Sequence, residues 1–302
     1  MPEESSIVAI VGLGAMGRRI AARLLGADFR VVVWNRTAER AAELVADGAW
    51  AASSPAEAAR DADFVLTMVS DPSALLAVTE GPDGVAAGIG PTATAVEMST
   101  VGPAAVHRLR SALPAGTALV DAPVLGSIAE AETGALSIFV GGEPPDVGRV
   151  EPVLANLGEP IRIGPLGSGA AAKLVANSTL FATVTALGET LALADGLGLE
   201  RETTFRVLEA TPFAAQAARR REPIERGEYP PRFSLALARK DSELVTEAAA
   251  QAGVDLRLAA AAATWLADAE LAGLGPKDYS AVLAHITERA RAQPDRAAPG
   301  PA

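Results

Sequence analysis

The chain has 302 residues, of which 49% are hydrophobic and 21% are charged, and its formal net charge is −11 at pH 7. It is long enough for two folded domains, and its negative charge argues against nucleic acid or an anionic membrane as a partner. With no cysteine and two histidines, disulfides, thiolate zinc sites and cysteine nucleophiles are excluded, and we expect no metal site.

The chain begins Met1-Pro2-Glu3-Glu4, a segment with two acidic residues. The first apolar run, Ile7–Val11, is too short for a signal sequence or a membrane-spanning helix. We therefore expect a cytoplasmic protein.

Short apolar runs alternate with alanine-rich amphipathic stretches in the first half of the chain. This alternation predicts strands joined by helices, in a largely parallel sheet covered on both faces. Ser54-Pro55-Ala56-Glu57 has the pattern of a capping box that begins one of these helices. The expected strands are Ile7–Val11, Arg30–Trp34, Phe64–Val69, Ala93–Met98, Leu119–Asp121, Leu136–Val140 and Ile161–Ile163.

A glycine-rich turn follows the first expected strand. It reads Gly12-Leu13-Gly14-Ala15-Met16-Gly17, which fits G-x-G-x-x-G between a strand and a helix. In dinucleotide-binding sites the first glycine permits a tight turn, the second lets the backbone approach a pyrophosphate, and the third lets helix and strand pack closely. The helix N-terminus then offers free N–H groups to the phosphates. A dinucleotide site is the prediction for this turn.

The second expected strand ends at Asn35-Arg36-Thr37. A site that prefers NAD normally has an acidic residue here for the ribose hydroxyls, and this chain has none. Arg36 offers a forked cation, and Asn35 and Thr37 add neutral hydrogen bonds, which suits a 2′-phosphate. We therefore expect NADP, as NADPH in the reducing direction, as the cofactor.

The pattern changes after the turn Gly164-Pro165-Leu166-Gly167. Gly169 to Leu197 contains no proline and predicts one long apolar helix, and the remainder is helical and rich in alanine. We thus expect an α/β chain with an N-terminal Rossmann-type, doubly wound parallel sheet over 1–165 and an all-α C-terminal domain for substrate and dimer contacts over 166–292. Residues 293–302 are expected to form a disordered tail. Because the expected helix from Gly169 to Leu197 is so apolar, we expect it to pack against a second subunit in a homodimer or higher homo-oligomer.

Lys173 and Asn177 lie four residues apart, on one face of this expected helix. Lys173 stands in an otherwise apolar run, where burial of an unpaired ammonium is costly and lowers its pKa, which suits acid–base chemistry. By contrast, His107 and the basic run Arg219-Arg220-Arg221 are expected to be packing or solvated surface residues, although one of these arginines could reach a substrate or a neighbouring subunit.

Four motifs occur in order along the chain: Gly12–Gly17, Asp121-Ala122-Pro123-Val124, Gly167-x-Gly169-x-x-x-Lys173-x-x-x-Asn177, and Lys240-Asp241. Together they resemble the β-hydroxyacid dehydrogenase family, which includes the 3-hydroxyisobutyrate dehydrogenases, over roughly residues 7 to 290. The segments Tyr229-Pro230-Pro231-Arg232-Phe233 and Asp278-Tyr279-Ser280-Ala281 are closer still to the glyoxylate and succinic semialdehyde reductases in that family.

The resemblance implies a role for each matching residue. Lys173 matches the family's catalytic lysine, which gives a proton to the carbonyl oxygen during reduction, and Asn177 would hold the substrate or orient the lysine. Met68, Val69, Ser70, Thr100 and Lys240 match cofactor contacts. Phe233 and Asp241 would line the substrate cleft. The chain is thus expected to be an NADP-dependent oxidoreductase that reduces a small aldehyde or keto acid or oxidises a 3-hydroxy acid.

The sequence departs from the family pattern after Val124. The family usually has a serine that binds the substrate carboxylate, whereas this chain reads Leu125-Gly126-Ser127. Leucine cannot donate that hydrogen bond, although the backbone N–H groups of Gly126 and Ser127 can. Three alternatives stay open: Ser127 replaces the missing hydroxyl; the enzyme is similar to imine reductases and takes a less polar substrate; or the protein is a non-catalytic, cofactor-binding scaffold. Lys173 argues against the last two.

Overall fold

The computed structural model describes residues 6–292, so the expectation for 293–302 lies outside the described residues. The chain divides into two compact units, Met1–Ala176 and Asn177–Ala302. The division falls inside the long helix α9 (Ser168–Gly196).

The first unit is built on a nine-stranded sheet in the order β3-β2-β1-β4-β5-β6-β8-β7, with β9 paired to β8. All pairs from β3 to β6 are parallel, whereas β8 runs antiparallel to β6 and β7. The strands are β1 (Ile7–Val11), β2 (Arg30–Trp34), β3 (Trp50–Ala51), β4 (Phe64–Thr67), β5 (Thr94–Glu97), β6 (Ala118–Asp121), β7 (Val124–Leu125), β8 (Leu136–Gly141) and β9 (Gly158–Gly164). The expected doubly wound fold is confirmed, with an antiparallel extension at one edge.

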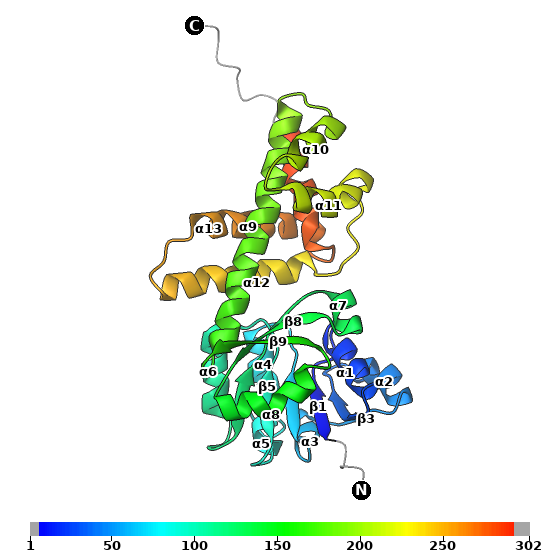
Figure 1. Ribbon diagram of the computed structural model, residues 1–302, viewed down its shortest axis with the longest axis vertical. Coiled ribbons are helices and arrows are strands. Elements are labelled where there is room, and N and C mark those ends of the chain that lie inside the picture. Colours follow the sequence, from blue (N-terminus) through cyan, green and yellow to red (C-terminus); the bar gives the residue numbers. More distant parts are fainter. Residues whose placement is uncertain (1–5, 293–302) are drawn as a thin grey trace. The chain divides into compact units, whose positions relative to one another are not determined.

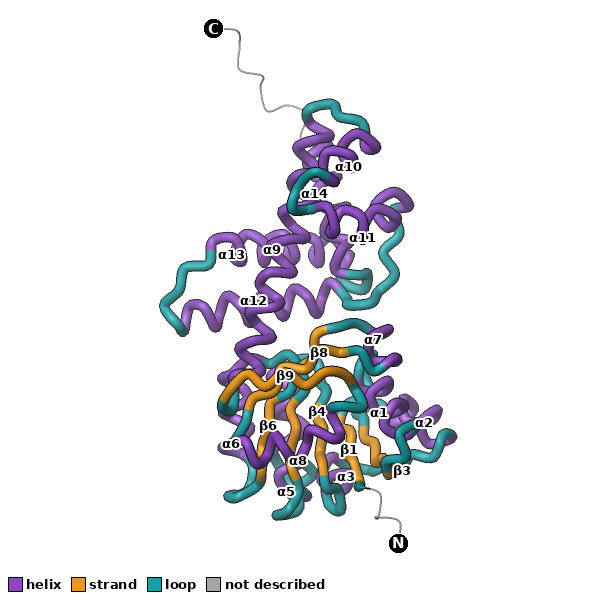
Figure 2. Tube along the Cα trace, viewed as in Figure 1, coloured by secondary structure: helices purple, strands orange, loops and turns teal. Residues whose placement is uncertain are grey.

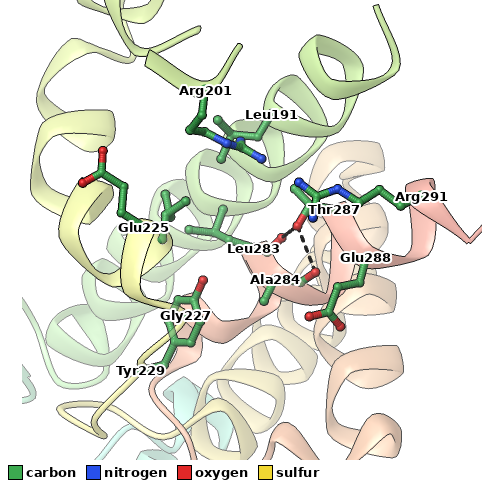
Figure 3. A pocket seen from close by; sticks show the side chains of 11 residues that line it. Leu191, Arg201, Glu225, Gly227, Tyr229, Leu283, Ala284, Thr287, Glu288 and Arg291 are labelled. Atoms are coloured by element: carbon green, nitrogen blue, oxygen red, sulfur yellow. Dashed lines mark hydrogen bonds between the residues drawn. The ribbon is translucent and has the colours of Figure 1, made fainter. Parts of the chain in front are cut away.

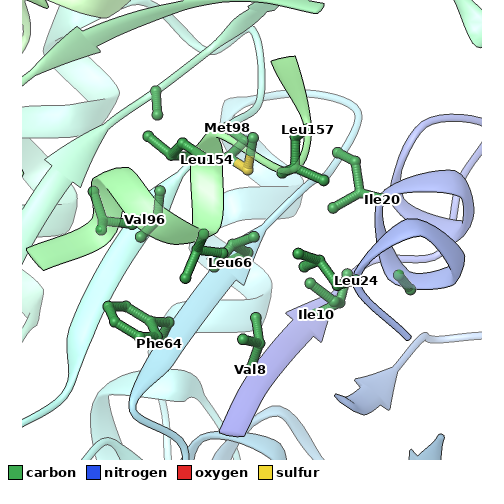
Figure 4. Packing of buried hydrophobic residues seen from close by; sticks show 14 of the residues in the cluster. Val8, Ile10, Ile20, Leu24, Phe64, Leu66, Val96, Met98, Leu154 and Leu157 are labelled. Atoms are coloured by element: carbon green, nitrogen blue, oxygen red, sulfur yellow. The ribbon is translucent and has the colours of Figure 1, made fainter. Parts of the chain in front are cut away.

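Helices cover both faces of this sheet, as the ribbon and the tube show (Figures 1 and 2). One core lies between the strands and helices α1, α2, α7 and α8, and the other between the strands and helices α3 to α6. In the first core, Ile20 and Leu24 of α1 and Leu154 of α8 meet Ile10 and Leu66 of the strands (Figure 4). The helices are α1 (Gly17–Leu25), η1 (Ala38–Ala41), α2 (Ala42–Ala46), α3 (Pro55–Ala59), α4 (Pro72–Thr79), α5 (Val85–Gly88), α6 (Gly102–Ala112), α7 (Ile128–Thr133) and α8 (Pro144–Leu154).

Burial on both faces explains why the central strands read as continuous apolar runs. All residues of β4 and β5 are buried, and a parallel strand covered by helices on both faces has no solvent side that would favour a polar residue. The capping box at Ser54 forms only in part. Ser54 accepts from the backbone N–H of Glu57, but the Glu57 carboxylate accepts from the N–H of Ser53 instead of Ser54.

The second unit contains helices only, apart from one isolated bridge between Ser234 and Asp278 among the described residues. Phe181, Leu187 and Leu191 of α9 are buried in its core. By length and composition α9 could also cross a membrane, but these side chains pack against the neighbouring helices. The helices after α9 are α10 (Arg201–Glu209), α11 (Ala214–Arg226), α12 (Leu235–Gln251), α13 (Arg257–Ala269), η2 (Glu270–Leu274), η3 (Tyr279–Ala281) and α14 (Val282–Arg291).

Candidate functional site

The glycine turn joins β1 to α1 with no room for side chains at two of its three glycines. Gly12 has a φ of +106°, and a Cβ there would lie 2.3 Å from the carbonyl oxygen of Met68. A Cβ on Gly17 would lie 2.0 Å from the carbonyl oxygen of Gly12. At Gly14, by contrast, nothing lies within 4 Å of a Cβ. Thus Gly12 and Gly17 set the turn, while Gly14 faces open space that a pyrophosphate can enter.

The first turn of α1 has no acidic residue and no side-chain cap on its N–H groups. Its positive dipole end is therefore available to an anion. Together with the open space at Gly14, this fits the phosphates of a dinucleotide.

Of the three residues after β2, Asn35 makes hydrogen bonds to the backbone, whereas Arg36 and Thr37 are exposed. Asn35 accepts from the backbone N–H of Leu13 at 2.9 Å and donates to the carbonyl of Thr37 at 2.9 Å, so its amide braces the glycine turn. Arg36 and Thr37 are exposed. Within residues 6–292 the guanidinium of Arg36 has no carboxylate within 4.0 Å, so it is available to an anion.

A buried hydrogen-bond network joins the ends of β4 and β5. The hydroxyl of Ser99 accepts from the N–H of Val69 at 2.8 Å, and Glu97 accepts from the N–H of Ser99 at 2.7 Å. Thr67 donates to the second carboxylate oxygen of Glu97. These bonds hold Met68-Val69-Ser70 and Thr100, all expected cofactor contacts, at the carboxyl edge of the sheet.

Glu97 is 1% exposed. Burial, with a smaller contribution from the nearby charge of Asp121, raises its pKa to about 7 against the opposing effect of hydrogen bonds from Ser99 and Thr67. The sequence pattern did not indicate a role for Glu97, because one of its partners, Thr67, lies 30 residues earlier in the chain. A carboxylate at the end of an apolar strand is the signal that could have indicated it.

Asp121 ends β6 and is fully buried. One of its oxygens accepts from the N–H of Gly167 at 2.7 Å and the other from the N–H of Ala170 at 2.6 Å. Burial raises the pKa of Asp121, while these backbone N–H groups oppose the rise. Asp121 thereby fixes the start of α9 to the carboxyl edge of the sheet.

Lys173 lies in the second turn of α9 and is the first charged residue of that helix. Its side chain is half-buried. The carboxyl edge of the parallel sheet in a doubly wound fold is where ligands bind. Lys173 therefore stands on a helix that begins where such a fold places its ligand.

The segment that departs from the family pattern forms the end of β7 and the start of α7. Leu125 is 39% exposed, and Gly126 has a φ of +144°. The N–H and hydroxyl of Ser127 both donate to the carboxylate of Glu130, at 2.7 and 2.5 Å, in a capping box. Ser127 is thus engaged in helix capping, which argues against its taking over a substrate hydrogen bond.

In the second unit, three expected site residues form one cluster. The Asn177 side chain donates to Asp241 at 2.9 Å, and Lys240 forms an ion pair with Asp241. Asn177 and Asp241 are 1% and 3% exposed. Among the described residues, the carbonyl oxygen of the Asn177 side chain is buried without a hydrogen-bond donor, so it can accept from a ligand.

Phe233 is held by residues whose role the sequence did not indicate. Asp278 accepts from the N–H of Phe233 at 3.2 Å, and the rings of Phe233 and Tyr279 lie 5.6 Å apart. Arg220, 5% exposed, donates to the hydroxyl of Tyr279 and lies over its ring. The expectation that Arg220 is solvated is wrong, because its side chain is buried against Tyr279. Sequence patterns could not indicate this contact, since Tyr279 lies 59 residues further along the chain.

A cavity of about 340 Å³ in the second unit contains none of the expected site residues (Figure 3). Arg201 and Arg291 line it, and both form ion pairs with Asp195. Glu225 and Glu288 also line it, so its charges are mixed. We do not assign it to the candidate site.

The structure groups the expected residues within each unit. In the first unit, the glycine turn, Asn35-Arg36-Thr37, Met68–Ser70, Thr100 and Lys173 follow the carboxyl ends of adjacent strands or the helix fixed there. In the second unit, Asn177, Lys240 and Asp241 form one buried cluster, and Phe233 is fixed separately.

Comparison with protein families covers nearly the whole described chain. Residues 7–167 match the NAD binding domain of 6-phosphogluconate dehydrogenase, and residues 167–286 match the NAD-binding domain of NADP-dependent 3-hydroxyisobutyrate dehydrogenase.

Characterised relatives match over almost their full length. Glyoxylate/succinic semialdehyde reductase 1 of Arabidopsis thaliana is 33% identical, over 91% of this chain and 96% of the relative. The 3-sulfolactaldehyde reductase of Escherichia coli is 32% identical, over 92% and 95%. The structure of Mycobacterium tuberculosis 3-hydroxyisobutyrate dehydrogenase, determined with L-serine, has a TM-score of 0.83 at 28% identity, and the match covers 93% of this chain and 99% of that one.

An imine reductase from Pseudomonas sp. has a TM-score of 0.58 at 22% identity, over 93% of this chain and 99% of that one. This similarity shows a shared fold only. The matched domains and relatives show that the chain is a member of the β-hydroxyacid dehydrogenase family and an oxidoreductase that uses a nicotinamide cofactor.

Proposed function

We propose that this protein is an NADPH-dependent reductase of a small aldehyde or keto acid, such as glyoxylate or succinic semialdehyde, with Lys173 as the general acid. In the reverse direction it oxidises a 3-hydroxy acid, with Lys173 as the base. The observation that carries the proposal is the place of Lys173, one helical turn beyond the N–H groups that Asp121 fixes to the carboxyl edge of the sheet. By their names, relatives of the chain act on glyoxylate and succinic semialdehyde, on 3-sulfolactaldehyde, or on 2-(hydroxymethyl)glutarate.

The chemistry needs a positive charge and a proton near the carbonyl oxygen. An oxygen that gains negative charge is stabilised by an ammonium, and the same group can deliver the proton. Lys173 performs both roles, while Asn177, held by Asp241, can accept from the hydroxyl of the hydroxy acid through its free carbonyl oxygen. When bound, the nicotinamide cofactor supplies the hydride.

We assign the cofactor as NADP on the exposed cation of Arg36 and the absence of an acidic residue from Asn35-Arg36-Thr37. The N–H groups at the start of α1 and the open space at Gly14 hold the pyrophosphate. Met68, Val69, Ser70, Thr100 and Lys240 complete the cofactor contacts that the family pattern implies.

A less polar substrate is the second candidate. Leu125 is partly exposed where the family pattern has a serine, and Ser127 is engaged by Glu130. An imine reductase-like enzyme would take a substrate without a carboxylate at this position. Lys173 favours the carbonyl substrate, because an ammonium stabilises an alkoxide but repels an iminium ion.

The deciding experiment compares NADPH oxidation by wild type and Lys173→Ala. The substrates are glyoxylate, succinic semialdehyde, methylmalonate semialdehyde and a cyclic imine. We expect Lys173→Ala to bind NADPH as wild type does and to lose about a hundred- to ten-thousandfold in kcat, the usual contribution of general acid–base catalysis.

Each other outcome has a clear reading. Unchanged turnover in Lys173→Ala would reject the proton-transfer role. Turnover of the cyclic imine alone would favour the second candidate, and no turnover of any substrate would favour a non-catalytic scaffold. Lys277→Ala is the matched control, because this lysine lies in the second unit outside the candidate site.

We further propose a cytoplasmic protein whose first domain, 1–165, binds the cofactor and whose second, 166–292, binds the substrate and forms a homodimer. The dimer is supported by exposed apolar residues on the second unit. Leu193 of α9 and Leu197, which directly follows α9, are 63% and 70% exposed.

A further inference from the structure

The start of α9 is capped from a distant part of the chain. Helix caps usually come from the residue just before the helix, but the carboxylate of Asp121 lies 46 residues before Gly167 and 49 before Ala170 in the sequence. Each of its oxygens accepts one N–H, and the N–H of Gly169 also stabilises the charge. The cap therefore ties α9 to the end of β6 as well as satisfying N–H groups at the start of the helix.

The surrounding backbone is shaped around this carboxylate. A Cβ on Gly141 would lie 2.5 Å from one oxygen of Asp121, and a Cβ on Gly169 would lie 2.9 Å from the other. A Cβ on Gly169 would also lie 2.2 Å from the carbonyl oxygen of Phe139. Gly169, a glycine of the family motif, thus allows the close approach of α9 to the sheet.

We propose that Asp121 is a positioning residue for Lys173. The inference rests on the proposed function, because it assigns to Asp121 the task of placing the proton donor. Lys173 lies three residues beyond Ala170, about 4.5 Å along the helix axis. A shift of the capped turn therefore moves the root of the lysine side chain. Catalysis is sensitive to such a shift, since a displacement of about 1 Å can cost about a hundredfold in rate.

The test is Asp121→Asn, which keeps the shape of the side chain. An amide can accept only one of the two backbone N–H groups, because its nitrogen is a donor. We expect a fall of about ten- to a hundredfold in kcat, with cofactor affinity and KM close to wild type. Asp63→Asn is the matched control, because Asp63 accepts the N–H of Ile7 at the amino end of the same sheet. Unchanged kcat in folded Asp121→Asn would overturn the inference.

A double variant separates positioning from a general structural effect. If Asp121 acts through Lys173, then Asp121→Asn has no further effect in the Lys173→Ala background, because coupled residues are not additive. An equal loss in both backgrounds overturns the inference. Wild-type turnover in Lys173→Ala rejects the proposed function and this inference with it. If kcat falls in Lys173→Ala but is unchanged in Asp121→Asn, the inference is rejected and the proposed function stands.

Hydrogen exchange in the wild-type protein provides a test that does not need the variant to fold. The amides of Gly167 and Ala170 should exchange as slowly as amides inside α9, because the buried carboxylate holds them. Fast exchange at these two amides would overturn the inference.

Discussion

Glu97 and Asp121 are partners in the register of the adjacent strands β5 and β6, so two buried carboxyl groups face the same carboxyl edge. Two such groups cannot both ionise cheaply. Asp121 accepts backbone N–H groups with both oxygens, which favours its ionised form. Burial raises the pKa of both groups, but Glu97 accepts only one backbone N–H, so we assign the proton below about pH 7 to Glu97, whose pKa is raised to about 7.

This assignment predicts a pH-dependent stability effect for Glu97→Gln. The pKa of Glu is 4.5 in the unfolded chain and about 7 at folded Glu97. The contribution of Glu97 to the free energy of unfolding of the wild type therefore falls as the pH rises from 4.5 to 7, and it stays constant above pH 7. Glutamine has no such loss. Relative to wild type, Glu97→Gln should therefore gain up to about 3 kcal/mol in unfolding free energy between pH 4.5 and 7.

Denaturant unfolding of both proteins across this pH range measures the effect. Glutamine can still accept the N–H of Ser99, and the hydroxyl of Thr67 can turn to the carbonyl of Val96, so the variant is expected to fold. A difference between the two proteins that does not change with pH would contradict the assignment of the proton to Glu97.

We propose that Arg36 determines the preference between NADPH and NADH. We expect wild type to prefer NADPH to NADH, and Arg36→Ala to reduce that preference about tenfold or more, because a hydrogen bond to a charged group contributes about 1.5–3 kcal/mol. The measurement is kcat/KM with each cofactor. Arg30→Ala removes an exposed cation from the other end of the same strand and should leave the ratio unchanged. Equal use of both cofactors by wild type would refute the 2′-phosphate assignment.

At the scale of elements, the β1–α1 junction offers a pair of substitutions that separate folding from binding. Gly17→Ala puts a Cβ 2.0 Å from a backbone oxygen of Gly12, whereas Gly14→Ala meets nothing within 4 Å. Gly17→Ala should lower the unfolding free energy by about 1–3 kcal/mol or more through overpacking.

Gly14→Ala should keep wild-type stability but weaken NADPH binding by about ten- to a hundredfold, because the methyl group occupies the approach of the phosphates. Thermal melting and fluorescence titration of NADPH measure the two effects. Loss of stability in Gly14→Ala, or unchanged cofactor affinity, would contradict this account of the turn.

The sequence predicts the elements where local pattern determines them. The apolar run Phe64–Val69 contains the buried strand β4, which ends at Thr67, and the proline-free run contains most of α9. It missed β3 and β7, two-residue strands too short to show a period. It also missed the partners of Asp121, Glu97 and Arg220. These contacts join residues 30 to 59 positions apart, and no local pattern records such pairs.

At the scale of the whole molecule, the surface of the second unit bears large exposed apolar side chains. Leu193 of α9 accepts at its carbonyl from the N–H of Leu197, which directly follows α9, and Val207 of α10 is 54% exposed. Water contact at such side chains is unfavourable, and a contiguous apolar patch usually marks an interface. A second copy of the chain is the partner that we propose, as the apolar character of α9 already predicts.

We therefore expect the wild-type protein to run as a dimer or larger homo-oligomer, and Leu193→Lys/Leu197→Lys to shift it toward the monomer. Each leucine that is buried at an interface contributes about 1.5–3 kcal/mol, and in a two-fold dimer both copies lose it. Light scattering coupled to size exclusion measures the mass. Trp50→Lys is the control, because Trp50 is 72% exposed on β3 of the first unit. A monomeric wild type, or a double variant with unchanged mass, would show that this face of α9 is not the interface.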